Sequence, residues 1–429
     1  GFVNKVYISD STLGYTFRNV QKDDTIQVKY KILLIGITTL SKSIVKGGDT
    51  ITIQGNYLNI NGSSLDIRSS VNKNDSVIVN LFNATVTSAK FIVPNNLTEG
   101  LYLIRVKESQ KVSNFAILRV YNHSNIVVSA FGDTSYGKLN VPLITTSVVK
   151  AVGGGNHSIA LLENGSLIGW GKNDSNQINV PTLLNVVDIA AGSNHSLALL
   201  SNGSVVGWGR NDNKQRDLVN NIHNGHLIQV AAGRIHSIGL LESGRPIGWG
   251  GNNVHQTDVP DTIENIISIA SGEFHNLGLK SDGTVWAWGD SSNDRNNVPS
   301  NLSDVVSVSA GGGQSVALLG TGSLVVWGAN SEGEGVTPSI NNAIKVSSGQ
   351  THNILLKSDS TLYAWGGNAY NQTRIPAYLN KNNILDISAG GNHNLVLLPV
   401  KIFTESTFGG RIDISKLTKL GGSDTINYS

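Results

Sequence analysis

The stretch Ala191-Gly-Ser-Asn-His195-Ser-Leu-Ala-Leu-Leu-Ser-Asn-Gly-Ser-Val-Val-Gly-Trp208-Gly209 decides the fold, because its pattern recurs along most of the chain. In six copies a tryptophan follows the recurring start position by thirteen residues: His157/Trp170, His195/Trp208, His236/Trp249, His275/Trp288, Gln314/Trp327 and His352/Trp365. The start positions, with His393 as a seventh, recur every 38 to 41 residues. A period of this length predicts a propeller or a solenoid, in which each unit buries a face against its neighbours.

Half-units at the two ends of the array indicate that it closes into a ring. Phe131-Gly132 stands where Trp-Gly is expected, and Ala389-Gly-Gly-Asn-His393 starts a seventh unit that ends at Pro399. An open array would leave both halves unpaired, with exposed strand edges, whereas pairing the last half with the first removes those edges. We therefore predict an all-β, seven-bladed propeller over residues 122–399, closed by strands 126–132 and 386–398.

Within one unit three strands are legible, at residues 185–192, 195–200 and 204–209. Asn202-Gly203 between the last two is typical of a two-residue type I′ hairpin. Glycine pairs at the unit starts, such as Gly153-Gly154, indicate close backbone approach near the ring axis. No segment keeps a 3.6-residue period, so helix is expected to be a minor component.

The repeat resembles that of the regulator of chromosome condensation family. Ala191-Gly192 to Leu199, followed by Gly203 and Trp208-Gly209-Arg210-Asn211, carries the resemblance, and seven copies over residues 126–399 agree. It implies a seven-bladed propeller. The short units are similar to those of β-lactamase-inhibitor propellers and of bacterial secreted repeats, and the loop insertion of the nuclear exchange factor is missing.

The flanking segments predict further β structure. Residues 34–121, with strand patterns at 46–56, 91–94 and 100–106, resemble an IPT/TIG immunoglobulin-like β-sandwich. Residues 1–33 are similar to the C-terminal part of a small β repeat domain of bacterial surface proteins. Residues 400–429 form a polar tail, for which a linker, the start of a following domain and a donated strand all remain open. We expect the sequence to be a piece of a longer protein.

Composition limits the classes of partner. The net charge is +2, with 14% charged residues and no basic cluster, which argues against nucleic acid and anionic membranes. No apolar run approaches the roughly 18 residues that would cross a bilayer, so no membrane insertion is expected. The chain has no cysteine, which excludes disulfides and thiolate metal sites. Low charge, no methionine and the resemblance to surface proteins favour an extracellular or cell-surface location.

The repeat histidines and tryptophans have a chemical and a structural interpretation. Six of the ten histidines occupy the repeat position, which suggests a ring of metal ligands or a set of buried scaffold residues. Zinc ligands must converge on one point, whereas blade-related histidines are spread around a circle, so we favour hydrogen bonds to neighbouring backbone. The tryptophans are expected to pack between blades. No catalytic or nucleotide-binding motif occurs, so we expect no enzyme, no cofactor and no metal.

Binding is expected on the loops that follow Trp-Gly, which form the propeller rim. Tyr136, Arg210, Arg295 and Tyr370 are the predicted anchors, because aromatic and arginine side chains dominate binding hot spots. Thirteen Asn-x-Ser/Thr sequons are present. Those predicted to carry glycan are Asn61, Asn74, Asn83, Asn96, Asn122, Asn173, Asn301 and Asn371.

The leading functional hypothesis is a non-enzymatic extracellular module, structural or adhesive, of a larger surface or fibre-forming β-domain protein. It would bind protein or glycan through the propeller rim and self-associate into a fibre. The alternatives are a soluble protein-binding propeller, such as an enzyme inhibitor, and a guanine nucleotide exchange factor for a small GTPase.

Overall fold

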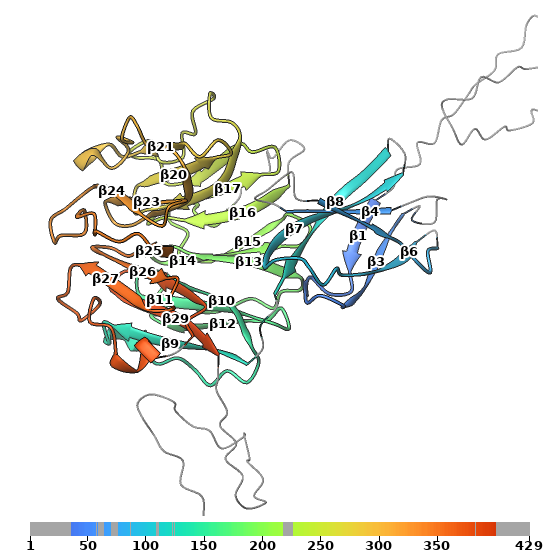
Figure 1. Cartoon of the computed structure of the whole chain (residues 1–429), viewed down its shortest axis with the longest axis horizontal. Coiled ribbons are helices and arrows are strands. Elements are labelled where there is room, and N and C mark those ends of the chain that lie inside the picture. Colours follow the sequence, from blue (N-terminus) through green and yellow to red (C-terminus); the bar gives the residue numbers. More distant parts are fainter. Residues whose placement is uncertain are drawn as a thin grey trace, which may run out of the picture.

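The computed structural model describes residues 36–56, 58, 64–69, 76–85, 87–108, 111–121, 123, 125–217, 226–381 and 383–399 (Figure 1). Its elements confirm the all-β class. Within these ranges the helical elements are three short 3-10 turns, η1 (Ser135–Gly137), η2 (Ser292–Asp294) and η3 (Ala377–Lys381). No helix of the described residues is long and apolar enough to span a bilayer. The expected segments 1–33 and 400–429 lie outside the described residues.

Seven three-stranded antiparallel sheets follow one another in chain order, and we call them blades 1 to 7. Blades 1 to 3 are β10 (Val148–Gly153), β11 (His157–Leu162) and β12 (Leu167–Gly171); β13 (Val186–Ala191), β14 (His195–Leu200) and β15 (Val205–Gly209); β16 (Leu227–Ala232), β17 (His236–Leu241) and β18 (Pro246–Gly250). Blades 4 to 6 are β19 (Ile266–Ser271), β20 (His275–Lys280) and β21 (Val285–Gly289); β22 (Val305–Ala310), β23 (Gln314–Leu319) and β24 (Leu324–Gly328); β25 (Ala343–Ser348), β26 (His352–Lys357) and β27 (Leu362–Gly366).

Blade 7 combines strands from both ends of the propeller. β28 (Asp386–Ala389) pairs with β29 (His393–Pro399), and β29 pairs in turn with β9 (Ile126–Gly132). The register places His393 opposite Gly132, the same pairing that His195 makes with Gly209 in blade 2. The ring thus closes through hydrogen bonds between its first and last strands, which leaves no unpaired edge there.

The hairpins between the second and third strands differ from the type I′ prediction. In blade 2 the Gly203 amide donates to the Leu200 carbonyl at 2.9 Å, and only Gly203 takes a positive φ, of 79°, whereas Asn202 does not. This is a type I turn followed by a left-handed residue, the usual three-residue loop. The Asn202 side chain favours that turn because its Oδ1 accepts from the Ser204 amide at 3.0 Å.

The antiparallel order gives the propeller two unlike faces. At the end of the blade where His195 pairs with Gly209, the glycine loop before His195 and the loop after Trp208 emerge together. We call the loops after each Trp-Gly, or after Phe131-Gly132, the post-Trp loops, and this side the axial-loop face. The opposite side carries the β14–β15 type of hairpin and is the hairpin face.

The N-terminal domain is a two-sheet β-sandwich. One sheet has the order β1 (Gly36–Leu40), β3 (Thr50–Asn56), β6 (Ser88–Ile92); the other has the order β2 (Ile44–Val45), β8 (Lys111–Val120), β7 (Gly100–Glu108), β4 (Ser64–Ser69), β5 (Ser76–Asn80). Its core is dominated by fully buried side chains from both sheets, such as Ile51, Phe91, Ile67 and Ile104. Alternation of apolar and polar residues along these strands accounts for the single buried layer between the sheets.

The sandwich packs on the hairpin face of the propeller, where β7 and β8 lie beside β13 and β15 (Figure 1). Leu103 and Ile117 share one apolar cluster with Val187 of blade 2. Arg119 bonds Asp188 of the same blade at 2.9 Å, and Arg105 pairs with Glu242 in the β17–β18 hairpin. These contacts combine apolar burial with charged pairs, so they fix the sandwich to blades 2 and 3.

Candidate functional site

Glycines line the axis of the propeller. Any larger residue at these positions would force neighbouring atoms to move. A Cβ atom on Gly192 would lie 2.3 Å from Cε1 of His195 and 2.4 Å from the carbonyl oxygen of Gly233 in the next blade. The equivalent positions are Gly154, Gly192, Gly233, Gly272, Gly311, Gly349 and Gly390. The predicted close backbone approach at the axis is therefore confirmed.

The repeat histidines form a closed ring of hydrogen bonds between blades. Nε2 of His195 lies 2.9 Å from Oγ of Ser237 in blade 3, and that hydroxyl donates to the Gln215 carbonyl at 2.7 Å. Because the hydroxyl proton is already used, Nε2 must carry the imidazole hydrogen and Nδ1 a buried lone pair. The side-chain links are His157–Ser196, His195–Ser237, His236–Asn276, His275–Ser315, Gln314–Asn353, His352–Asn394 and His393–Ser158.

This ring supports a structural role for the histidines and corrects one detail. Their Nε2 atoms bond side chains of the next blade, and the expected bonds to neighbouring backbone are wrong for these atoms. Burial lowers the pKa of His157 to about 4 and that of His195 to about 3, so the rings are neutral. Among the described residues, no group of three histidine or acidic side chains could hold a metal ion.

The repeat tryptophans connect each blade to the post-Trp loop of the blade before it. Trp208 of blade 2 is 6% exposed, and its Nε1 donates to the Gln177 carbonyl at 2.9 Å. The same carbonyl accepts from Oγ of Ser196 at 3.0 Å. The predicted packing of these tryptophans between blades is confirmed. Trp170 and Trp327 make the equivalent Nε1 bond, whereas Nε1 of Trp249, Trp288 and Trp365 is buried without a partner.

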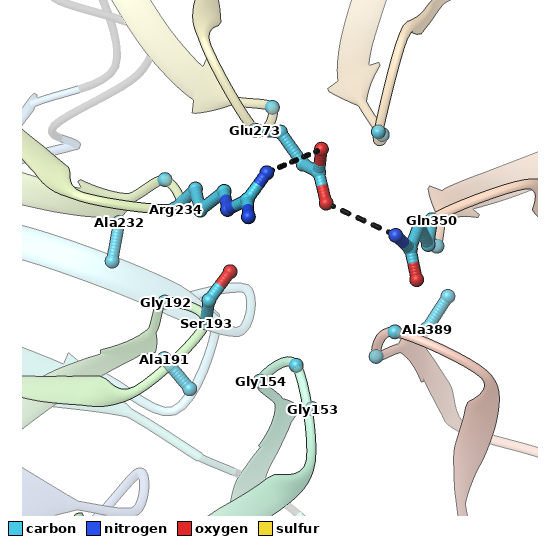
Figure 2. Close-up of a pocket in the computed structure, with 18 of the residues that line it drawn as sticks. Gly153, Gly154, Ala191, Gly192, Ser193, Ala232, Arg234, Glu273, Gln350 and Ala389 are labelled. Carbon is cyan, nitrogen blue, oxygen red and sulfur yellow. Dashed lines mark hydrogen bonds and ion pairs between the residues drawn. The ribbon is translucent and has the colours of Figure 1, made fainter. Parts of the chain in front are cut away.

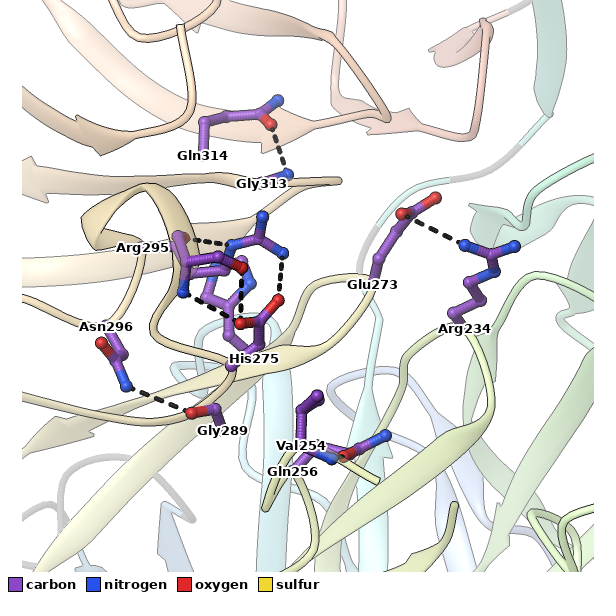
Figure 3. A network of polar contacts seen from close by, with 12 residues as sticks. Arg234, Val254, Gln256, Glu273, His275, Gly289, Arg295, Asn296, Gly313 and Gln314 are labelled. Atoms are coloured by element: carbon purple, nitrogen blue, oxygen red, sulfur yellow. Dashed lines mark hydrogen bonds and ion pairs between the residues drawn. The ribbon is translucent and has the colours of Figure 1, made fainter. Parts of the chain in front are cut away.

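Every post-Trp loop has a buried polar side chain seven residues after the aromatic position. These residues are at most 8% exposed: Lys138, Gln177, Gln215, Gln256, Arg295, Glu334 and Gln372. Arg295, one of the four predicted anchors, is therefore buried within its loop. Its guanidinium lies 3.1 Å from Asp290 and close to His275, facing inward (Figure 3).

The other three predicted anchors do reach the surface of the axial-loop face. Tyr136 is 59% exposed and Tyr370 is 50% exposed, on the post-Trp loops of blades 7 and 6. Lys172 lies over the Tyr136 ring at 5.0 Å. Arg210 is exposed on the loop of blade 2, where it pairs with Asp212 at 2.6 Å. The structure therefore distributes the anchors around the ring instead of gathering them at one point.

Five of the predicted glycosylation sites are exposed in the structure: Asn83, Asn96, Asn173, Asn301 and Asn371. Asn61, Asn74 and Asn122 lie outside the described residues. Asn173 differs from the others because its Nδ2, the atom that would carry a glycan, donates to Oδ1 of Asn179 at 2.8 Å. Modification there would have to break a contact within the loop.

Sequence reasoning missed a polar cluster at the mouth of the axial pocket. It occupies the position two residues before the repeat histidine, where the seven blades carry Gly155, Ser193, Arg234, Glu273, Gly312, Gln350 and Gly391. Arg234 and Glu273 approach to 3.9 Å, and Nε2 of Gln350 donates to Oε1 of Glu273 at 3.2 Å (Figure 2). We call Arg234, Glu273 and Gln350 the axial cluster.

The electrostatics of the axial cluster are uneven. Burial raises the pKa of the Glu273 carboxyl, although the neighbouring Arg234 and Arg295 act in the opposite direction. The Arg234 side chain is 53% exposed and its guanidinium lies 5.2 Å from the Phe274 ring centre. The mouth thus offers one half-buried carboxyl and one accessible guanidinium, a pair that can bind charged or polar groups of a partner. The sequence does contain a signal for this cluster, because charged residues replace glycine at this one position of the repeat.

Comparisons with known proteins agree with this geometry. Residues 148–177, 186–215, 266–295 and 343–372 match the Regulator of chromosome condensation (RCC1) repeat. Blades 1, 2, 4 and 6 therefore contain RCC1 repeats. The structure of Prp20p from Saccharomyces cerevisiae is similar, with 20% identity, a TM-score of 0.57, and coverage of 66% of this chain and 93% of that one. No curated protein sequence gives a significant match.

Two further solved structures share the fold. Yeast RCC1 (Prp20) bound by Kap60 has 19% identity and a TM-score of 0.56, covering 65% of this chain and 90% of that one. Human WBSCR16 has 18% identity and a TM-score of 0.54, covering 64% of this chain and 99% of that one. At this identity the likeness concerns the RCC1-type fold alone.

The matched segments do not cover every blade. Blades 3, 5 and 7 lie outside the four matched segments; blade 3 holds Arg234 of the axial cluster, and blade 5 holds Gln314, the one glutamine at the histidine position. The other two members of the axial cluster, Glu273 and Gln350, lie within the matched segments 266–295 and 343–372.

Proposed function

We propose that this chain is a non-enzymatic protein-binding module, and that the axial-loop face of a seven-bladed RCC1-type propeller carries its binding site. The observation that carries the proposal is the axial cluster. Three blades have glycine at the same position, so the scaffold has no need of Arg234, Glu273 and Gln350 there. Charged groups at an exposed mouth are the type of feature that selects a partner.

Other features of the same face support the proposal. The exposed Tyr136, Arg210 and Tyr370 lie on post-Trp loops of the same face and are residue types that dominate binding energy. The contacts of the sandwich with Val187, Asp188 and Glu242 all lie on the opposite face. The similar Prp20p is described by its binding to Gsp1p and histones, which are protein partners.

The test compares the wild-type chain with Arg234→Ser/Glu273→Gly, which installs residues that blades 1 and 2 already carry. Both chains are immobilised and exposed to candidate partners, and each protein that only the wild type retains is purified and titrated by calorimetry. We expect one-to-one binding that the double variant weakens about tenfold or more, a loss of about 1.4 kcal/mol.

A matched control removes an arginine of similar exposure, 47% against 53% for Arg234, from the hairpin face. Arg245→Ser breaks the pair with Asp261, at 2.7 Å, and should leave the affinity unchanged. Equal binding by all three chains, or the failure of the wild type to retain any protein that the double variant loses, would reject the axial cluster as the site.

The setting that we propose is extracellular, as part of a larger surface or fibre-forming protein with an immunoglobulin-like domain of the IPT/TIG type before the propeller. The two-sheet sandwich and the exposed sequons at Asn83 and Asn96 support this setting. Measuring the intact mass of the native protein before and after glycan removal tests it. A carbohydrate mass is expected, and an unglycosylated protein located inside the cell would contradict the proposal.

An exchange factor for a small GTPase is the alternative that the Prp20p likeness suggests. The assay is nucleotide release from purified Gsp1p with and without this chain. We expect no acceleration under the main proposal. Acceleration that is lost in Arg234→Ser/Glu273→Gly would favour the alternative and place that activity at the same mouth.

A further inference from the structure

A ring of apolar residues on the hairpin face is generated by β-bulges in the first strand of blades 1 to 6. In blade 2 the register shifts between Val186 and Asp188, so Val187 is the extra residue and turns out of the ladder. The extra residues are Val149, Val187, Ile228, Ile267, Val306 and Ile344. All of them are aliphatic, so the propeller presents a repeated apolar spot to this face.

The sandwich covers only one side of this ring. Val187 is fully buried and Ile228 is 4% exposed, both in one cluster with Ile117 of the sandwich. Val306 and Ile344, at the same strand position in blades 5 and 6, are 55% and 56% exposed. Burial of these two side chains against an apolar surface would be favourable, so this half of the ring is competent to bind one.

Next to the covered half of the ring, the ion pair of Lys150 and Asp188 binds Arg119 of the sandwich. Nζ of Lys150 in blade 1 donates to Oδ1 of Asp188 at 2.7 Å, and Nη2 of Arg119 donates to the same oxygen at 2.9 Å. Arg119 also donates through Nε to the Val187 carbonyl. We call Val149, Lys150, Val187 and Asp188 the first mount.

The same four positions recur in blades 6 and 7 as Ile344, Lys345, Leu385 and Asp386, which we call the second mount. Lys345 donates to Oδ1 of Asp386, as Lys150 does to Asp188. The register is also the same, since Asp188 lies opposite Leu199 and Asp386 opposite Leu397. The Asp386 side chain is 24% exposed, whereas that of Asp188, under Arg119, is 5% exposed.

We propose that the second mount binds a β-strand of a partner protein, in which an arginine follows a large aliphatic side chain by two residues. Ile117 and Arg119 of β8 have this spacing, and in a strand it places both side chains on one face. The arginine would share Asp386 with Lys345, and the aliphatic side chain would pack against Ile344. A lone carboxylate between two cations gives charge-assisted hydrogen bonds that select arginine over neutral residues.

One contact of the first mount has no counterpart in the second. The Ile117 amide donates to the Ser201 carbonyl in the β14–β15 hairpin, whereas blade 7 has the separate strands β29 and β9 at that place. The second mount therefore lacks a backbone hydrogen bond and is expected to bind reversibly, unlike the permanent attachment of the sandwich.

The experiment uses the full chain and a fluorescent peptide with the sequence of residues 111–121, which contains the Ile117-Leu-Arg119 pattern. Fluorescence anisotropy should show saturable binding in the micromolar to millimolar range. Ile344→Glu in the protein, or Arg119→Gln in the peptide, should weaken it about tenfold or more. Because Ile344 is exposed, its substitution leaves the fold intact, and unfolding curves verify this.

Ile78→Glu is the matched control, because Ile78 is also 56% exposed but lies on β5 of the sandwich. It should bind the peptide as the wild type does. The absence of saturable binding at millimolar peptide, or equal binding to Ile344→Glu, overturns the proposal. Sedimentation velocity tests whether a second copy of the chain occupies this surface instead. Self-association that Ile344→Glu abolishes would assign the surface to that second copy and would also overturn the proposal.

Discussion

At the residue scale, Gln314 shows what the repeat position requires. Its Nε2 donates to Oδ1 of Asn353 at 3.4 Å and to the Gly349 carbonyl at 3.1 Å, in place of the Nε2 hydrogen of a histidine. His236 faces an asparagine too, because its Nε2 lies 2.8 Å from Oδ1 of Asn276. The position therefore requires a buried side chain that can donate a hydrogen bond to the next blade. An aromatic ring is not required.

This interpretation predicts that His236→Gln is mild and His236→Ala severe. The glutamine can keep the bond to Asn276, so we expect a loss of about 1 kcal/mol in the free energy of unfolding. The alanine leaves Oδ1 of Asn276 with the Ser271 hydroxyl as its remaining donor, at 2.8 Å, and opens a buried cavity, at a cost of about 3 kcal/mol. Urea denaturation of the three proteins at pH 7.5 measures both values. Equal destabilisation by the two substitutions would contradict the donor argument.

At the element scale, the post-Trp loops differ in their buried polar side chain, which is a glutamine in four blades, Glu334 in blade 5 and a cation in blades 4 and 7. In most blades a glutamine at the buried position holds the loop, as when Oε1 of Gln177 accepts from the Ser175 amide at 2.9 Å. Blades 4 and 7 instead have an aspartate directly after Trp-Gly or Phe-Gly and a cation at the buried position, namely Asp290/Arg295 and Asp133/Lys138. Buried charges need a counter-charge, which explains why the two replacements occur together.

The pairing predicts non-additive effects in blade 4. Asp290→Asn leaves the guanidinium of Arg295 buried without its partner and should cost about 3 kcal/mol. Asp290→Lys/Arg295→Gln copies the Lys172/Gln177 combination of blade 1 and should recover much of that loss. A double-mutant cycle in thermal unfolding, with Asp290→Lys and Arg295→Gln as the two single variants, measures the coupling. Additive effects would show that the pair does not hold this loop.

Elements that repeat were predictable from the sequence, whereas departures from the repeat were harder to place. Phe131 and His393 predict the closure of the ring because their spacing continues the period. The burial of Arg295 could not be inferred from its residue type, since an arginine in a polar loop is usually exposed. The position of the sandwich was also hidden, because the bulge residues Val187 and Val306 are identical and only the long-range contact of Ile117 distinguishes them.

At the scale of the whole molecule, the histidine ring makes the fold sensitive to acid. Burial lowers the pKa of each of the six ring histidines, to about 4 for His157, His236 and His352 and to about 3 for His195, His275 and His393. In the unfolded chain the value is about 6.5. Their contribution to stability is therefore complete above pH 6.5 and is lost as the pH falls from 6.5 towards 4.

The quantity to measure is the slope of the free energy of unfolding against pH. Each histidine contributes about 1.4 kcal/mol per pH unit well below pH 6.5, so six together approach about 8 kcal/mol per unit. A stability of about 5–15 kcal/mol would then vanish within one or two pH units. Urea midpoints at several pH values between 7.5 and 5 should fall steeply, and less so in His236→Gln, which removes one titrating group. A flat profile over this range would mean that the imidazole rings are protonated while the blades stay packed together. That result would contradict the tautomer that Ser237 imposes on His195.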